Sequence, residues 1–305
     1  MKGRRRALGL AVALIAAGGV DADDGILGTR PGYTDKAISA VPNAAAISRR
    51  IWAPGLDEGF VPQGVALAGD RLFVAGYRGD QSDPGRGESR IFEVDPATGA
   101  VTGQIILPAE VGHPGGLAVD GATLFVADSG KLLRLDLPRS LASGRAVITG
   151  RRSVAAEMGP SFLTLHEGAL WFGPFKRETG PDPRLYRVPL EVVFVRGRTP
   201  PLLPRDATHS LRIPLLVQGV TFDRENQLWL SASVQKEGWL YRVAVEDGRV
   251  LARHAMPPGI EDLAATSAGR IWSVGECGSK RWLKSATFYP LLFEIDPTRL
   301  AVELR

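Results

Sequence analysis

The stretch Gly64-Val-Ala-Leu67, followed by Leu72-Phe73 and then by Ile91-Phe-Glu-Val-Asp95, contains the pattern that decides the fold. A short apolar segment leads through a tight turn to a segment that opens with an aliphatic–aromatic pair. A third segment then alternates apolar and polar residues. The pair recurs at intervals of 43 to 58 residues, at Leu124-Phe125, Leu170-Trp171, Leu228-Trp229 and Ile271-Trp272. Repeats of this length are typical of the four-stranded blades of a β-propeller.

The five units predict an all-β protein, a five-bladed β-propeller with four antiparallel strands in each blade. We expect a more polar fourth strand in each unit, at residues 101–107, 145–149, 192–195, 249–256 and 300–304. Residues 46–52 read as one further strand, which we expect to pair with the last blade and close the ring, because closure removes an open sheet edge. A sixth blade stays open as an alternative. The propeller domain then covers residues 46–305.

Composition agrees with this fold and excludes other classes. The 305 residues include 36 Gly and 22 Pro, which suits a turn-rich β protein. The single cysteine, Cys277, cannot form an internal disulfide. A chain that is 44% hydrophobic and 23% charged is also too apolar for a disordered protein.

The N-terminal residues 1–22 read as a secretory signal peptide. Lys2 and three arginines precede the apolar stretch 7–20, and small residues place the cleavage after Ala22. The apolar stretch is shorter than the roughly 20 residues that span a bilayer, so we expect a secreted or periplasmic protein with no stable membrane span after cleavage. Residues 23–45 are expected to be a leader or linker. Residues 1–22 hold four basic residues and one acidic residue, so the net charge falls from +4 to about +1 without them. No basic stripe remains for nucleic acid.

Strand parity predicts which rim of the propeller carries a site. Turns from first to second and from third to fourth strands share one rim, whereas second-to-third loops and the crossings between blades share the other. The long segments 77–89, 175–183, 196–212 and 276–290 are all assigned to the second rim. Long loops on a rigid scaffold are where binding sites concentrate. We therefore expect the site around the channel mouth on this long-loop rim.

The polar residues expected at this mouth form two groups. Glu261 and Glu276 are the candidates for general acid–base catalysis, because neighbouring carboxyl groups can have separated pKa values. Asp262 should point away from Glu261 and accept backbone amides between blades. The candidate ligand-binding residues are Gln63, Tyr77, His113, Asp128, Ser161, His209, Gln218, Ser233, Arg281 and Lys284.

Two resemblances to known families add expectations. Phe60-Val-Pro-Gln-Gly-Val65, Gly69-Asp-Arg-Leu-Phe73 and Thr98-Gly-Ala-Val101 resemble the opening blade of the five-bladed glutaminyl-peptide cyclotransferase family, and the likeness extends over residues 60–297. It implies cyclotransferase activity, with Gln63 at a matching site position. The glutamate that this family carries after the aliphatic–aromatic pair corresponds to Val74 here.

The chain also resembles the gluconolactonase and calcium-dependent phosphotriesterase superfamily, which includes periplasmic bacterial propellers. Its hydrolytic members hold a metal in the channel through a Glu, Asn and Asp set. That resemblance implies a site for Ca²⁺ or another divalent cation at Glu261, with Gln63 and Gln218 as the nearest substitutes for the remaining ligands.

These observations lead to one main functional hypothesis and two alternatives. The main hypothesis is a propeller that binds a small polar ligand, peptide or protein on the long-loop face around the channel. The first alternative is an enzyme that uses the same channel mouth, either a lactonase- or esterase-like hydrolase with or without a divalent metal, or a glutaminyl cyclotransferase. The second alternative is a protein–protein interaction scaffold. The sequence contains no Gly-rich phosphate loop, HExxH motif or Gly-x-Ser-x-Gly elbow.

Overall fold

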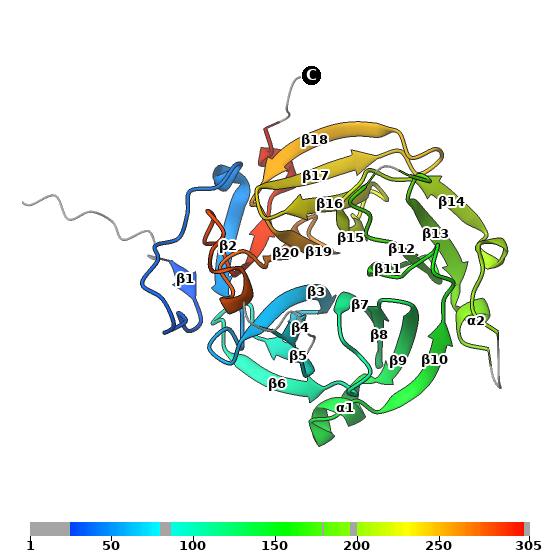
Figure 1. The fold of residues 1–305 in the computed structure, drawn as a ribbon, viewed down its shortest axis with the longest axis horizontal. Helices are drawn as coiled ribbons and strands as arrows, with labels where there is room; N and C mark the ends of the chain where they lie inside the picture. Colours follow the sequence, from blue (N-terminus) through cyan, green and yellow to red (C-terminus); the bar gives the residue numbers. More distant parts are fainter. Residues whose placement is uncertain (1–24, 80–86, 179, 196–199, 302–305) are drawn as a thin grey trace, which may run out of the picture.

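The structure, a computed structural model, describes residues 25–79, 87–178, 180–195 and 200–301. Five sheets surround a central axis, and the chain passes from each sheet to the next around the ring (Figure 1). This arrangement confirms the five-bladed propeller, and no sixth blade occurs within the described ranges. The expected signal peptide at residues 1–22 lies outside the described residues. No helix in the described part of the chain is long and apolar enough to cross a membrane.

Each of the first four blades contains four consecutive strands, and the first strand of each blade lines the channel. Blade 1 contains β3 (Phe60–Ala68), β4 (Arg71–Arg78), β5 (Ser89–Val94) and β6 (Val101–Ile106). Blade 2 contains β7 (Pro114–Asp120), β8 (Thr123–Asp128), β9 (Lys131–Asp136) and β10 (Ile148–Ser153). Blade 3 contains β11 (Phe162–His166), β12 (Ala169–Gly173), β13 (Arg184–Pro189) and β14 (His209–Arg212). Blade 4 contains β15 (Val217–Phe222), β16 (Leu228–Val234), β17 (Glu237–Val243) and β18 (Val250–Met256).

Blade 5 combines the two ends of the chain. Its inner strands are β19 (Ile260–Ala265), β20 (Ile271–Gly275) and β21 (Leu291–Ile295), and its fourth strand is β2 (Ile47–Trp52), which pairs antiparallel with β21. A short strand, β1 (Ile26–Leu27), adds a parallel pairing to β2. The N-terminal strand therefore closes the ring, as predicted. The expected fourth strand at 300–304 is wrong where it is described, because β2 already occupies that edge and residues 300 and 301 form no strand. Residues 302–304 lie outside the described ranges.

Helices interrupt two blades where strands were expected to begin. Residues 190–193 form the short helix α2 (Leu190–Val193) instead of the fourth strand of blade 3. Leu190 and Val193 are three residues apart, so one helical turn packs both against the core of blades 2 and 3. In blade 2, Asp136 caps the helix α1 (Leu137–Ser143) by accepting the Arg139 amide at 3.0 Å, and β10 starts later than expected. The remaining helical turns are the 3₁₀ segments η1 (Ala44–Ala46), η2 (Pro204–Asp206), η3 (Lys280–Trp282) and η4 (Pro297–Arg299).

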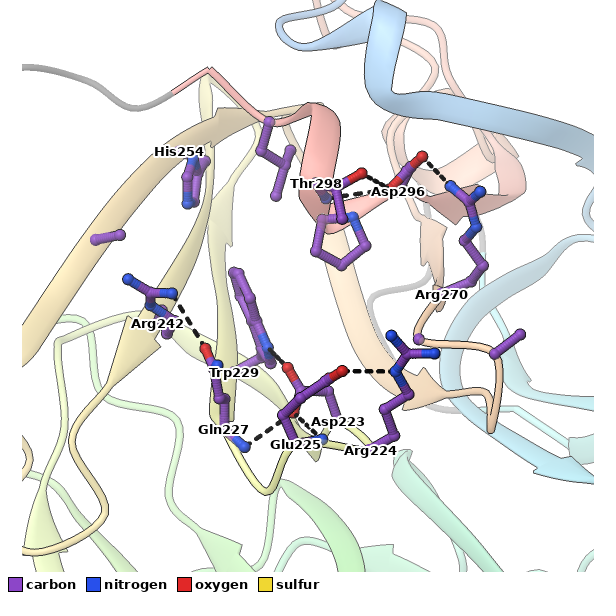
Figure 2. A pocket seen from close by; sticks show the side chains of 15 residues that line it. Asp223, Arg224, Glu225, Gln227, Trp229, Arg242, His254, Arg270, Asp296 and Thr298 are labelled. Atoms are coloured by element: carbon purple, nitrogen blue, oxygen red, sulfur yellow. Dashed lines mark hydrogen bonds and ion pairs between the residues drawn. The ribbon is translucent and has the colours of Figure 1, made fainter.

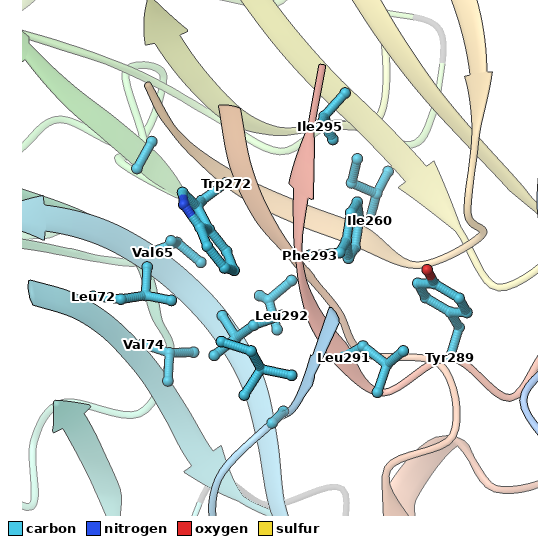
Figure 3. Packing of buried hydrophobic residues seen from close by; sticks show 14 of the residues in the cluster. Val65, Leu72, Val74, Ile260, Trp272, Tyr289, Leu291, Leu292, Phe293 and Ile295 are labelled. Carbon is cyan, nitrogen blue, oxygen red and sulfur yellow. The ribbon is translucent and has the colours of Figure 1, made fainter. Parts of the chain in front are cut away.

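The aliphatic–aromatic pairs bury side chains on both faces of each blade. Leu72 packs into the cluster between blades 5 and 1, whereas Phe73 packs into the cluster between blades 1 and 2. Consecutive strand residues point to opposite faces, so two adjacent apolar residues serve two interfaces. Figure 3 shows the first of these clusters, in which Trp272 of blade 5 lies beside Val65 and Leu72 of blade 1. Each buried side chain of this kind stabilises the fold by about 1.5–3 kcal/mol. The core is thus divided among the interfaces between blades.

Candidate functional site

The channel mouth is shaped by irregularities in the inner strands on the long-loop rim. The register shifts between Pro62 and Val65, between Val217 and Gly219, and between Ile260 and Leu263. A bulge of this kind adds a residue and re-aims its side chain, and bulges are frequent beside functional sites. The residues inside these three bulges include Gln63, Gln218, Glu261 and Asp262. The sequence therefore predicted the correct positions for the mouth, but not the bulges.

Glycines beside the bulges let the inner strands approach closely. A Cβ atom on Gly219 would lie 2.5 Å from the Cα of Asp262, and one on Gly116 would lie 2.2 Å from the backbone nitrogen of Leu163. Side-chain atoms cannot occupy such distances, so only glycine fits there. The strands consequently surround a narrow channel, and polar side chains gather above it.

Two buried glutamates form the centre of the site. Glu261 is 2% exposed, and its Oε1 accepts a hydrogen bond from Nε2 of Gln218 at 3.0 Å. Glu276 is 6% exposed and accepts hydrogen bonds at both oxygens. Nε1 of Trp282 donates to its Oε2 at 2.6 Å, Nε2 of Gln63 donates to the same atom at 3.3 Å, and Nε2 of Gln235 donates to its Oε1 at 3.4 Å. Blades 1, 4 and 5 all contribute to this cluster, which we call the carboxyl–amide cluster.

Burial raises the pKa of both glutamates. Burial raises the pKa of Glu276 to about 7, although Trp282, Gln63 and the charge of Arg281 oppose that increase. Burial also raises the pKa of Glu261 well above its usual range, and the charges of Glu276 and Asp262 add to the increase. Glu276 therefore exchanges a proton near neutral pH, where a general acid or base works best.

Asp262 connects the blades beneath this cluster. Its Oδ2 accepts the backbone amides of Val65 at 3.0 Å and Leu117 at 3.1 Å, which belong to blades 1 and 2. Burial raises its pKa well above the usual range, while the backbone amides that contact it act in the opposite direction. The expectation that Asp262 points away from Glu261 and accepts amides between blades is confirmed. Its role in this geometry is to hold the inner strands together.

Aromatic and basic side chains lie beside the carboxyl–amide cluster. Nη1 of Arg281 donates to the Tyr77 hydroxyl at 2.9 Å, and its guanidinium lies 5.1 Å from the centre of the Trp282 ring. The His113 ring lies 5.3 Å from that of Tyr77. The structure thus brings Tyr77, His113 and Arg281, three of the candidate ligand-binding residues, close together. These side chains place one positive charge and flat ring faces near Glu276.

The other predicted residues have different surroundings. Asp128 accepts the His113 backbone amide at 2.8 Å and forms an ion pair with Lys131 at 3.0 Å, so it fixes the crossing from blade 1 to blade 2. The Ser161 hydroxyl accepts the Phe175 amide at 3.1 Å. The Ser233 hydroxyl is buried with no hydrogen-bond partner within the described ranges. Lys284 is exposed to solvent.

The prediction for His209 is wrong. His209 begins β14, the outer strand of blade 3, and its Nε2 lies 2.9 Å from the carbonyl oxygen of Val245 on the rim of short turns. Because residues 209–212 form the fourth strand, the connection before them joins a third to a fourth strand and belongs to that opposite rim. The assignment of segment 196–212 to the long-loop rim is wrong for the same reason, although residues 196–199 themselves lie outside the described part.

The residues predicted to hold a divalent cation do not fit one. Gln218 and Gln63 direct their Nε2 donors at Glu261 and Glu276, so the amide nitrogens of both side chains, and not the oxygens that bind metals, contact the carboxyl groups. The described residues contain no group of three His, Cys, Asp or Glu side chains that could hold a metal ion. Carboxyl groups with raised pKa values would also have to lose their protons before they could bind a metal. The chemistry of the site is therefore derived from its side chains alone.

Comparison of the structure with solved proteins gives a fold relationship. The chain shares its fold with the glutaminyl cyclase of Myxococcus xanthus. The two chains are 15% identical, the match covers 85% of this chain and 97% of the other, and the TM-score is 0.52. The PQQ-bound aldose sugar dehydrogenase of Streptomyces coelicolor matches at 15% identity, over 77% of this chain and 94% of its own, with a TM-score of 0.46. No protein-family model matches the sequence, and no curated protein matches it either. At 15% identity the relationship concerns the fold.

Two features of the site were not predicted. Gln235 lies in the short connection between β16 and β17, which parity assigns to the long-loop rim, but only the long segments had been considered. The second feature is the segment 28–41, which packs along the loop that carries Glu276. The Tyr33 hydroxyl donates to the Gly278 carbonyl at 2.5 Å, and Nζ of Lys36 donates to the Leu283 carbonyl at 2.6 Å. Residues 28–41 therefore form a strap on the site loop, within the stretch 23–45 that was expected to be a leader or linker.

Proposed function

We propose that this propeller binds a small polar ligand at the channel mouth on its long-loop rim, and that Glu276 exchanges a proton with that ligand. The observation that carries the proposal is the environment of Glu276. Donors from blade 1, from blade 4 and from its own loop hold one buried carboxyl group in a fixed orientation. Its pKa of about 7 keeps both protonation states populated near neutral pH. A fixed polar group with a shifted pKa beside a channel is typical of a binding or catalytic site.

The surroundings of Glu276 indicate the ligand class. Arg281 offers a positive charge that can pair with a carboxylate or polarise a carbonyl group. Glu276 in its ionised form accepts a proton or a hydrogen bond from an amine. Tyr77 and Trp282 supply ring faces beside these groups. A molecule that carries an amine and a carbonyl or carboxyl group, such as an amino acid or the N-terminus of a peptide, matches this arrangement. The signal-like pattern of residues 1–22 supports export to the periplasm or the medium as part of the same proposal.

A thermal-unfolding screen at pH 7 tests the proposal. Amino acids and dipeptides are added to the chain from residue 23 onward, and a ligand at about 100 times its dissociation constant should stabilise the folded state by roughly 2.7 kcal/mol. We expect the stabilisation to disappear in Glu276→Gln and Arg281→Met. Lys284→Met, in the same loop but exposed, should retain it. A stabilisation of equal size in all three variants would place the ligand elsewhere and refute the proposal.

A second candidate function is cyclisation of an N-terminal glutamine residue. Two observations favour it: the fold shared with a glutaminyl cyclase and the ionisable Glu276 at the channel mouth. In that reaction the α-amine nitrogen bonds to the side-chain carbonyl carbon, and the carbon–nitrogen bond of the amide breaks to release ammonia. Glu276 would take the proton from the attacking amine and return it to the leaving nitrogen. Val74, at the position of the family's glutamate, is buried in the apolar cluster between blades 5 and 1 and supplies no acid.

Ammonia release from a glutaminyl peptide distinguishes this candidate from simple binding. We expect turnover by the wild type and its loss in Glu276→Gln, with Lys284→Met as the active control. Tight binding of the peptide without ammonia release would leave the binding function and exclude the cyclase.

A further inference from the structure

A cavity lies between blades 4 and 5, on the rim opposite the channel mouth. It has a volume of about 530 Å³. Figure 2 shows its two walls: Trp229, Arg242 and His254 stand on the strands of blade 4, and Arg270 and Asp296 belong to blade 5. The turn between β15 and β16, which belongs to the rim of short turns, forms its floor. This interblade cavity is therefore separate from the carboxyl–amide cluster. Its volume is in the range of small-molecule sites.

The carboxylates of this cavity already have partners. Asp223 accepts the backbone amides of Glu225 and Gln227 and, at 2.8 Å, the indole Nε1 of Trp229. Glu225 pairs with Arg224 at 2.6 Å. Asp296 pairs with Arg270 and accepts hydrogen bonds from Thr298. Two of the three arginines of the wall are thus compensated by carboxylates.

The third arginine, Arg242, lacks such compensation. Its Nη1 donates to the neutral Oε1 of Gln227 at 3.1 Å, and no carboxylate pairs with it among the described residues. Its Nε–H group is buried and has no acceptor in the described part of the chain. A half-buried positive charge without a counter-ion is costly, and an unsatisfied donor beside it needs a physical reason. The lining holds three arginines and three carboxylates, and among its described residues Arg242 is the arginine that has no ion-pair partner.

The groups around Arg242 are held in place before any ligand arrives. Asp223 fixes the indole of Trp229, and Gln227 fixes the guanidinium of Arg242. Nδ1 of the buried His254 lies 2.9 Å from the carbonyl oxygen of Ala301, so Nδ1 donates a hydrogen bond to that oxygen and the ring is held in place. A preorganised wall of this kind reduces the entropy lost when a ligand binds.

We propose that the interblade cavity binds a small organic monocarboxylate, whose carboxylate group pairs with Arg242. The guanidinium group suits a carboxylate because two parallel N–H donors match its two oxygens. Arg224 and Arg270 already pair with carboxylates, so Arg242 is the guanidinium of the lining that remains for a ligand, and one guanidinium matches one carboxylate group. This site does not depend on the function proposed for the channel mouth.

Isothermal titration calorimetry with acetate, lactate, benzoate and inorganic phosphate tests the proposal, with chloride at matched ionic strength as the reference. We expect saturable binding of at least one monocarboxylate at millimolar concentrations and weaker binding of phosphate. Arg242→Gln should weaken the binding at least tenfold. Arg249→Gln, which removes an exposed charge from the same blade, should bind as the wild type does.

The calorimetry can support or overturn monocarboxylate binding at Arg242, provided that the variant is folded. Circular dichroism establishes that Arg242→Gln is folded; if it is not, Arg242→Lys replaces it, and we expect that variant to bind measurably more weakly because it loses the paired donors. Absence of saturable heat with every monocarboxylate, tighter binding of phosphate, or unchanged affinity in the Arg242 variant would each overturn the proposal.

Discussion

Replacing Glu276 with glutamine should remove a loss of stability that the wild-type chain shows as the pH rises. In the folded protein, burial raises the pKa of Glu276 from 4.5 to about 7. The folded state therefore binds this proton more tightly than the unfolded state does. The stabilisation that follows is fully present below about pH 4.5, and it is lost as the pH rises through about 7. Glutamine keeps the shape of the side chain and carries no titrating proton.

The size of the effect follows from the same two pKa values. Each tenfold change in proton affinity corresponds to about 1.4 kcal/mol, so a pKa that rises from 4.5 to about 7 corresponds to roughly 3 kcal/mol. Glu261 and Asp262 are also buried with raised pKa values, and they add a pH dependence of the same sign to both proteins. The difference between wild type and Glu276→Gln therefore reports the titration of Glu276 together with its electrostatic effect on Glu261.

Urea unfolding measures this difference. It is carried out at a series of pH values from about 5 to 8, which bracket the upper part of the pH range over which the stabilisation is lost. The quantity to follow is the free energy of unfolding of Glu276→Gln minus that of the wild type. We expect this difference to increase by roughly 3 kcal/mol from the acid limit to the alkaline limit. Glu246→Gln, an exposed carboxyl on blade 4, is the control and should follow the wild-type curve. Curves for wild type and Glu276→Gln that run parallel over the whole range would refute the reasoning.

Three further predictions concern the residues that support the site. Asp262→Ala removes the acceptor of two buried amides and should lower the free energy of unfolding by about 3 kcal/mol or more, measured in urea; near-wild-type stability would contradict its role. Gly219→Ala should cost about 1–3 kcal/mol, because its Cβ would lie 2.5 Å from the Cα of Asp262, whereas Gly180→Ala, which meets no atom within 4 Å, should be neutral. Tyr33→Phe loses the hydrogen bond to the Gly278 carbonyl, so we expect a cost of about 1 kcal/mol and faster amide exchange in the site loop; unchanged exchange would show that the strap does not hold the loop.

The blades could be predicted because their sequence signal is local. Leu72 and Phe73 are adjacent, and each packs against a different neighbouring blade, so the pair itself reports a strand buried on both faces. Ring closure by residues 47–52 was also predictable, since a lone strand next to an incomplete blade removes a sheet edge. The fourth strand of blade 3 was not, because helix α2 depends on the tertiary packing of Leu190 and Val193.

The site was partly predictable because the strand pattern that places some of its residues is also local in the sequence. Gln63, Gln218 and Glu261 lie in the first halves of the inner strands, and parity alone places them at one rim. His209 was misplaced because its rim depends on which residues form the fourth strand. The contact between Tyr33 and Gly278 joins residues 245 positions apart, outside the repeat, and no local pattern reports it. The pKa of Glu276 depends on burial, which is a property of the folded chain.

The central claim is that Glu276 exchanges a proton near neutral pH with a ligand bound at the channel mouth. Carbon-13 NMR of the glutamate carboxyl groups tests this claim most directly. The spectra are recorded through a pH titration with and without the amino acids and dipeptides of the ligand screen. We predict one glutamate resonance with a midpoint at about pH 7, absent from Glu276→Gln and shifted when a ligand binds at the channel mouth. Titration of this resonance near its ordinary acidic value, or a resonance that no member of the panel moves, would contradict the account.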